Sequence, residues 1–250
     1  MTALVYIGSL LFWGYMLAVS LVCFPIAALI RVVTAPFDRR LAALHMFSCF
    51  WASLYLWANP LWGLRIEGRD RIDRRVAYVM VCNHQSLADI IILFRLFVHF
   101  KWVSKAENFR IPLVGWNMRL NRYISIQRGS ARGNLGMVRG CETALRQGSS
   151  VMIFPEGTRS PDGALQEFRQ GAFEIALRTQ APVLPIVIDG TATALPKRGF
   201  LFRGRHSIRV RVLQPLAPPW PAGKDAATLR VEVHGAIARE LQAMREGAAG

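Results

Sequence analysis

The sequence has few cysteines and no cluster of metal ligands, and each shortage excludes a class of protein. Its four cysteines lie singly in separate apolar segments, without a C-x-x-C pair. Disulfide frameworks and zinc sites depend on closely spaced cysteines, so we predict reduced cysteines in the core. None of the five histidines belongs to a ligand-spaced cluster. We therefore expect no metal and no other cofactor.

Acidic residues are also scarce. Asp and Glu total 16 against 31 Lys and Arg, which gives a net charge of +15 and favours anionic partners. No stacking aromatics alternate with the basic residues and no familiar nucleic-acid motif occurs, so we expect no nucleic-acid partner. The hydrophobic content of 52% exceeds that of an ordinary soluble protein. The expected partner is therefore a membrane bilayer with anionic lipids.

The N-terminal part lacks charge over two long stretches. No charged side chain occurs from Thr2 to Ile30, a length that can cross the ~30 Å hydrocarbon layer. It has no preceding basic residues and no cleavage site, unlike a signal peptide. A second uncharged stretch, Leu41 to Leu64, is rich in Trp and Tyr, as is typical of a membrane interface. The positive-inside rule disfavours two crossings here, so we expect a re-entrant hairpin or one interfacial segment. Two buried helices of a soluble bundle are the alternative.

From Arg65 onward the composition is that of a folded α/β domain, with apolar runs separated by polar turns. We therefore divide the chain into membrane-anchoring helices, residues 1–64, and one folded domain, residues 65–250. The apolar runs predict strands at 76–82, 100–104, 123–128, 151–154, 183–188 and 207–213. The expected fold class is α/β: a mixed, largely parallel sheet flanked by helices and preceded by an N-terminal membrane-embedded helical hairpin.

A polar turn, Asn83 to Asp89, follows the first of these strands and precedes a helix. It places His84 at the carboxyl edge of the sheet, where α/β enzymes keep their chemistry. Asp89, in the first helical turn, can accept the imidazole Nδ1–H and leave Nε2 free as a base. This is a Ser-His-Asp triad without its nucleophile, which could be a hydroxyl of the substrate. The alternative is that His84 and Asp89 merely cap the helix.

A second polar turn, Pro155 to Ser160, ends the strand at 151–154. Gly157 brings exposed backbone N–H groups, Thr158 brings a hydroxyl and Arg159 brings a guanidinium. Together these groups favour a phosphate cradle at the strand end. The alternative is a plain turn with a surface arginine.

Four ordered blocks resemble the 1-acylglycerol-3-phosphate acyltransferases and their glycerolipid acyltransferase relatives. They are N-H-x4-D at 83–89; Lys105, Pro112, Gly115 and Arg128; F-P-E-G-T-R-S at 154–160; and an apolar block at 182–186. The resemblance covers about residues 60–195. Gln127 departs from the pattern, because many members of the family carry an acidic residue before the arginine. This departure bears on the exact acceptor more than on the reaction.

The resemblance implies acyl transfer from acyl-coenzyme A or acyl carrier protein to the free hydroxyl of lysophosphatidic acid, giving phosphatidic acid in phospholipid biosynthesis. His84 would deprotonate the hydroxyl, and Asp89 would stabilise the imidazolium. The acceptor's phosphate would be bound by Arg128, Glu156, Gly157, Thr158 and Arg159. Because a carboxylate repels phosphate, we expect Glu156 to hold Arg128 or Arg159 in place. Lys105 would stabilise the tetrahedral oxyanion or bind the donor's phosphates. Residues 65–250 would then be a catalytic domain on the cytoplasmic face of the inner membrane.

Several alternatives stay open. The acceptor could be another lysolipid, such as a lyso-aminolipid or a different lysophospholipid. A non-catalytic protein that binds anionic lipids would use the same basic surface without needing His84. A thioesterase or phospholipase would use water or Ser86 instead of an acceptor hydroxyl. Ser86 is poorly placed for this role, because it lies two residues beyond the histidine on the same turn.

Overall fold

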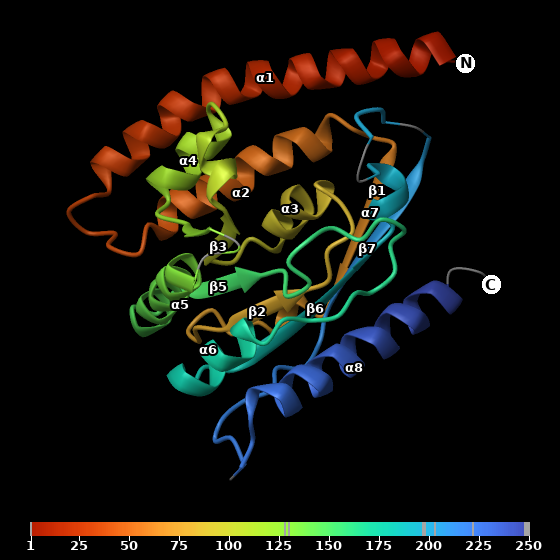
Figure 1. Ribbon diagram of the computed structural model, residues 1–250. Coiled ribbons are helices and arrows are strands. Elements are labelled where there is room, and N and C mark those ends of the chain that lie inside the picture. Colours follow the sequence, from red (N-terminus) through yellow and green to blue (C-terminus); the bar gives the residue numbers. More distant parts are fainter. Residues whose placement is uncertain are drawn as a thin grey trace.

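A single mixed sheet forms the centre of the molecule (Figure 1). This computed structural model describes residues 2–127, 129, 131–196, 199–202, 204–221 and 223–247. The seven strands lie in the order β1-β7-β6-β2-β5-β3-β4. Their bounds are β1 (Trp62–Glu67), β2 (Val79–Cys82), β3 (Phe100–Lys105), β4 (Ile124–Ile126), β5 (Ser150–Ile153), β6 (Val183–Asp189) and β7 (His206–Val212). Among these strands only β6 and β7 pair antiparallel, which confirms the mixed, largely parallel sheet.

Helices cover both faces of the sheet (Figure 1). One face carries α1 (Thr2–Val33), α2 (Ala42–Trp57), α3 (Ala88–Leu93) and α4 (Val114–Leu120). The other face carries α5 (Ala131–Arg146), α6 (Gly171–Thr179) and α8 (Ala226–Glu246). Shorter helical segments are α7 (Thr191–Ala194), η1 (Arg69–Arg71), η2 (Phe94–Leu96) and η3 (Ala106–Arg110).

The central strand β2 shows why this sheet needs cover on both sides. Val79 and Val81 pack into the apolar cluster under α5, α6 and α8, while Met80 and Cys82 pack into the cluster under α2 and α3. All four side chains are buried. A strand buried on both faces requires a continuous apolar run, so the first polar residues stand at its end. Polar side chains that could react with a substrate are therefore found only after the end of β2, at the edge of the sheet.

Helix α1 differs from the other helices in its exposed apolar surface. Among the described residues it is the one helix long and apolar enough to cross a membrane, over Ala3–Val33. Only 17% of its most apolar window is buried, whereas a core helix of a soluble protein would be mostly buried. Helix α2 has 16 residues, fewer than the ~20 needed to span a bilayer. It packs between α1 and the sheet, with Trp51 toward α1 and Cys49 in the core over the sheet.

Strand β1 was absent from the sequence prediction, because its first residues lie in the uncharged stretch that ends at Leu64. It is the edge strand and pairs with β7 in register from Trp62↔His206 to Glu67↔Arg211. Its burial is incomplete and irregular. Such a strand is fixed by a partner about 140 residues away, and its own apolar pattern gives little signal.

Candidate active site

The carboxyl ends of three neighbouring strands bring the predicted residues to one edge of the sheet. Strand β5 lies between β2 and β3, and all three run parallel. The turn after β2 carries His84, the turn after β5 carries Glu156, and β3 ends at Lys105. The two polar turns are therefore direct neighbours, as parallel pairing of their strands requires.

His84 and Asp89 form the hydrogen bond expected from their spacing. The His84 Nδ1 and Asp89 Oδ2 atoms are 2.8 Å apart. The same oxygen accepts the backbone N–H groups of Gln85 and Ser86, at 2.7 and 2.9 Å. The Asp89 side chain is fully buried, whereas that of His84 is 13% exposed. A carboxylate acceptor fixes the proton on Nδ1 and leaves Nε2 as a basic, solvent-reachable nitrogen. Asp89 therefore closes the turn and also orients the ring.

The second turn holds the histidine from the other side. The His84 ring stacks on Phe154, with centroids 3.8 Å apart and planes 9° apart. The backbone N–H of His84 donates to Glu156 Oε1 at 2.8 Å, and the His84 carbonyl accepts from the Ser160 N–H at 2.8 Å. The ring is thus fixed by contacts from a segment about 70 residues away. The local sequence does not indicate this support, since Phe154 belongs to an apolar run that is typical of a buried strand.

Glu156 is bonded to the backbone of both neighbouring segments. Its Oε1 atom accepts from the His84 backbone N–H at 2.8 Å, and the Gln166 backbone also donates to the carboxyl group. Its expected role in holding Arg128 or Arg159 stays a prediction. The side chain is 4% exposed, and burial raises its pKa to about 7, although the hydrogen bond from His84 acts in the opposite direction. The nearby Asp89 carboxylate raises the pKa further. Glu156 therefore links the two polar turns.

This raised pKa predicts a pH-dependent stability. Between about pH 4.5 and 7 the unfolded chain ionises Glu156 while the folded chain keeps it protonated, so the stability it contributes falls as the pH rises. We expect Glu156→Gln to remove this decline, which is on the order of 1–3 kcal/mol. Thermal unfolding in detergent at pH 5 and 8 measures it, with the exposed Glu107→Gln as control. Parallel curves for wild type and Glu156→Gln would contradict the assignment.

The cradle is shaped by Gly157, whose φ is +72°. An added Cβ there would lie 2.8 Å from the Nε atom of Arg169, so a larger residue would displace this guanidinium. The Gly157 N–H donates to the Phe154 carbonyl at 3.0 Å and is not free for a ligand. Thr158 is exposed and Arg159 is half-buried. Arg169 thus places a guanidinium beside this turn, and no sequence motif predicted that position for it.

The other predicted site residues differ in their location and exposure. Lys105 is exposed at the end of β3, on the same edge as His84. Arg128 lies outside the described residues. Ser86 is fully buried and its Oγ donates to the Leu195 carbonyl at 2.6 Å, so it is a structural residue and not a nucleophile. In the described part of the chain, no three His, Cys, Asp or Glu side chains gather as metal ligands would.

The fold and the site define an α/β protein with a hydrogen-bonded histidine–aspartate pair at the carboxyl edge of its sheet. A family model described as Acyltransferase matches residues 63–189, which include both polar turns. The chain belongs to this acyltransferase family.

Similar proteins share both sequence and fold. Curated 1-acyl-sn-glycerol-3-phosphate acyltransferases of Chlamydomonas reinhardtii and of Arabidopsis thaliana chloroplasts are each 34% identical, over 94% and 82% of this chain. The chain spans 70% and 56% of their respective lengths. The crystal structure of the 1-acyl-sn-glycerophosphate acyltransferase PlsC from Thermotoga maritima has a TM-score of 0.78 and 24% identity. The structural match includes 96% of this chain and 98% of the Thermotoga maritima chain. This structural likeness establishes the fold.

Proposed function

We propose that the protein transfers a fatty acyl group from an acyl thioester to the free hydroxyl of lysophosphatidic acid, giving phosphatidic acid for phospholipid biosynthesis. The observation that carries this proposal is the basic Nε2 atom of His84, held by Asp89 without a serine or cysteine nucleophile beside it among the described residues. The curated relatives are named for the same acceptor, a 1-acylglycerol 3-phosphate.

The reaction then needs no covalent enzyme intermediate. His84 Nε2 accepts the proton of the acceptor hydroxyl as its oxygen attacks the thioester carbonyl. Asp89, a buried carboxylate on Nδ1, stabilises the imidazolium that forms. As the tetrahedral intermediate collapses, the C–S bond breaks and the imidazolium returns the proton to the departing thiolate. Lys105, at the same edge, stabilises the oxyanion or binds a phosphate of the donor.

An acyl-transfer assay with purified protein in detergent tests the proposal. It crosses acyl-coenzyme A and acyl carrier protein donors with lysophosphatidic acid, a lyso-aminolipid and other lysophospholipids. Transfer to lysophosphatidic acid is the expected result. Transfer to a different lysolipid would replace the acceptor, and thioester hydrolysis without transfer would indicate a thioesterase. Lipid binding without any turnover would leave a non-catalytic membrane protein.

We assign the acceptor's phosphate to the turn after β5 and the end of β4. Arg128, Thr158 and Arg159 supply the charge and hydrogen bonds, Gly157 shapes the turn, and Glu156 positions it against His84. A guanidinium is well suited to phosphate, because it forms paired charge-assisted hydrogen bonds.

Arg159→Ala is expected to raise the KM for lysophosphatidic acid about 10- to 150-fold, since a charge-assisted hydrogen bond contributes roughly 1.5–3 kcal/mol. The KM for the acyl donor is expected to stay nearly unchanged. Steady-state kinetics with each substrate varied in turn measures both, and the exposed Arg74→Ala serves as control. A rise in donor KM alone would assign this turn to the donor instead.

We further propose that the N-terminal part, residues 1–64, anchors the protein in the cytoplasmic membrane through α1, while α2 and the start of β1 join it to the sheet. Residues 65–250 form the catalytic domain on the cytoplasmic face. Helix α1 supplies the apolar surface, with Leu4, Leu10 and Leu11 each more than two-thirds exposed. The net charge of +15 adds attraction to anionic headgroups.

A chain that begins at Thr34 is expected to leave the membrane fraction far more readily than the full chain. Helix α2 is retained in this variant because it covers the sheet. Residual binding to anionic vesicles is expected at low salt and is lost as ionic strength rises, because screening weakens the attraction. Flotation with anionic and neutral vesicles measures both the binding through α1 and the electrostatic binding. Unchanged retention at high salt would show that α1 is not the anchor.

A further inference from the structure

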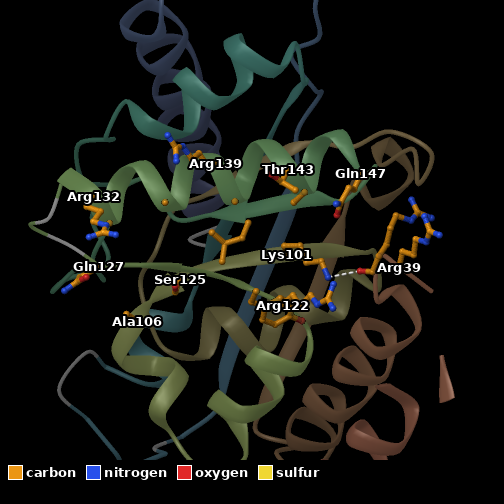
Figure 2. A pocket seen from close by; sticks show the side chains of 17 residues that line it. Arg39, Lys101, Ala106, Arg122, Ser125, Gln127, Arg132, Arg139, Thr143 and Gln147 are labelled. Carbon is orange, nitrogen blue, oxygen red and sulfur yellow. Dashed lines mark hydrogen bonds between the residues drawn. The ribbon is translucent and has the colours of Figure 1, made fainter. Parts of the chain in front are cut away.

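A cavity lined by basic residues lies away from His84. It is a groove of about 760 Å³ between α5 and the edge strand β4 (Figure 2). Its floor includes Lys101 of β3, and it extends from Gln127 and Arg132 at the carboxyl edge of the sheet to Arg39 at the opposite edge. We call it the α5 groove.

The lining of the α5 groove carries charge of one sign. Its basic residues are Arg39, Arg40, Lys101, Arg122, Arg132 and Arg139, and its described lining contains no Asp or Glu. Arg39, Arg122 and Arg132 are exposed, and none of them forms an ion pair with a described carboxylate. Mutual repulsion of unpaired cations is unfavourable, and a bound anion relieves it.

Lys101 is the most unusual of these cations, because it is only 6% exposed. Its Nζ donates to the carbonyls of Arg40 and Asn121, at 2.7 and 2.8 Å, which leaves one ammonium N–H without a described partner. Burial is the main reason that the Lys101 pKa falls to about 8; Asp38 acts in the opposite direction, and the Arg122 and Arg31 cations add to the fall. A buried ammonium without a paired carboxylate is a favourable place for an anion.

The groove stays open beside α5 because two glycines of this helix, which have no side chain, face it. The apolar residues of α5, Met137, Cys141 and Leu145, face the core, whereas Gly136 and Gly140 face the groove. A Cβ at Gly136 would meet no atom within 4 Å, so a side chain there would enter empty space. The groove therefore has room beside its cations for a flat or bulky group.

The distance from the groove to His84 is close to the length of the pantetheine arm of coenzyme A together with its diphosphate. Lys101 pairs with Val151, which pairs with Val79, and His84 lies five residues beyond Val79. His84 stands two residues past the end of β2, so five residues of extended chain and two strands across give an upper limit of about 19 Å for the separation. The pantetheine arm of coenzyme A is as long as about four residues, roughly 14 Å when extended, and its diphosphate follows directly.

We propose that the α5 groove binds the phosphorylated nucleotide of an acyl-coenzyme A donor, with its phosphates among Arg39, Lys101 and Arg122 and its thioester reaching over the sheet edge to His84. This inference rests on the proposed acyl transfer and names the donor. The large volume and the distance to His84 favour a nucleotide over a single lipid headgroup.

The test compares two donors that carry the same acyl chain, acyl-coenzyme A and an acyl-N-acetylcysteamine thioester, which lacks the nucleotide. The double variant Arg39→Ala/Arg122→Ala is expected to raise the KM for acyl-coenzyme A on the order of 10- to 100-fold. Gly136→Phe is expected to do the same by filling the groove, without changing charge. Neither variant should change the kinetics with the truncated thioester or the KM for lysophosphatidic acid. Arg146→Ala, on the same helix but paired with Glu142 outside the groove, is the matched control.

Equal losses with both donors, or no loss with either, would overturn the proposal. Direct binding of adenosine 3′,5′-bisphosphate by calorimetry provides a readout that does not depend on turnover. Loss of this binding in both variants supports the groove even if the wild type transfers no acyl group, in which case only the proposed function fails. If the variants instead lose binding to phosphatidic acid vesicles and keep nucleotide binding, the groove is a lipid headgroup site and the proposal is wrong.

Discussion

His84→Ala is expected to lower kcat by ~10²–10⁴-fold or more, the usual contribution of a general base. Nε2 is the basic atom of the site, because Nδ1 is bound to Asp89 at 2.8 Å. Alanine removes this base, and Ser86 cannot provide a covalent route instead, since it is buried and bound to Leu195. The KM for each substrate is expected to change little, because the imidazole accepts the proton in the transition state and does not bind the substrate's phosphate.

Folding controls separate this effect from simple destabilisation. The variant loses the stack on Phe154 but keeps both backbone hydrogen bonds of residue 84, so its melting temperature should fall only slightly. His206→Ala, at the start of β7, removes a histidine that bonds Thr193 and lies two strands away from β2, and it is expected to retain activity. Near-wild-type turnover of His84→Ala in a folded protein would reduce the motif to a turn-closing element.

Asp89→Ala is expected to be as damaging to kcat as loss of the histidine, within the range of ~10²–10⁴-fold. It would leave the His84 ring unoriented and would leave the N–H groups of Gln85 and Ser86 without their acceptor. Each buried N–H without a partner costs roughly 1–3 kcal/mol. A marked fall in melting temperature should therefore accompany the loss of activity.

Asp89→Asn separates the charge from the geometry. Because two backbone N–H groups point at the Oδ2 position, the amide oxygen must occupy it and can still accept from His84 Nδ1. The correct tautomer is kept and only the negative charge is lost, so we expect a smaller loss of about 10–10²-fold. Steady-state kinetics of both variants, with melting curves, make the comparison. Equal losses for Asn and Ala would show that charge, not orientation, is the main contribution of Asp89.

Local sequence was sufficient for six of the seven strands and for the polar turns at the edge of the sheet. Buried strands such as β2 and β5 must be continuous apolar runs, and the residues that follow them must be polar, so both the strands and the turns are visible in the chain. The spacing of His84 and Asp89 likewise fixes their contact, because Asp89, in the first turn of α3, folds back over the polar turn to the ring. The mixed, largely parallel sheet was predicted on this basis and confirmed.

The tertiary structure decided what these local elements do to one another. Glu156 accepts a hydrogen bond from the His84 amide, and Phe154 stacks on the imidazole, because parallel pairing of β2 with β5 joins segments about 70 residues apart. The edge strand β1 and the α5 groove depend on still more distant partners. Sequence periodicity records which side of an element is apolar, whereas contacts between polar residues depend on strand order and register. The local pattern therefore identified His84 and Asp89, and only the assembled fold determined the support around them and the separate basic groove.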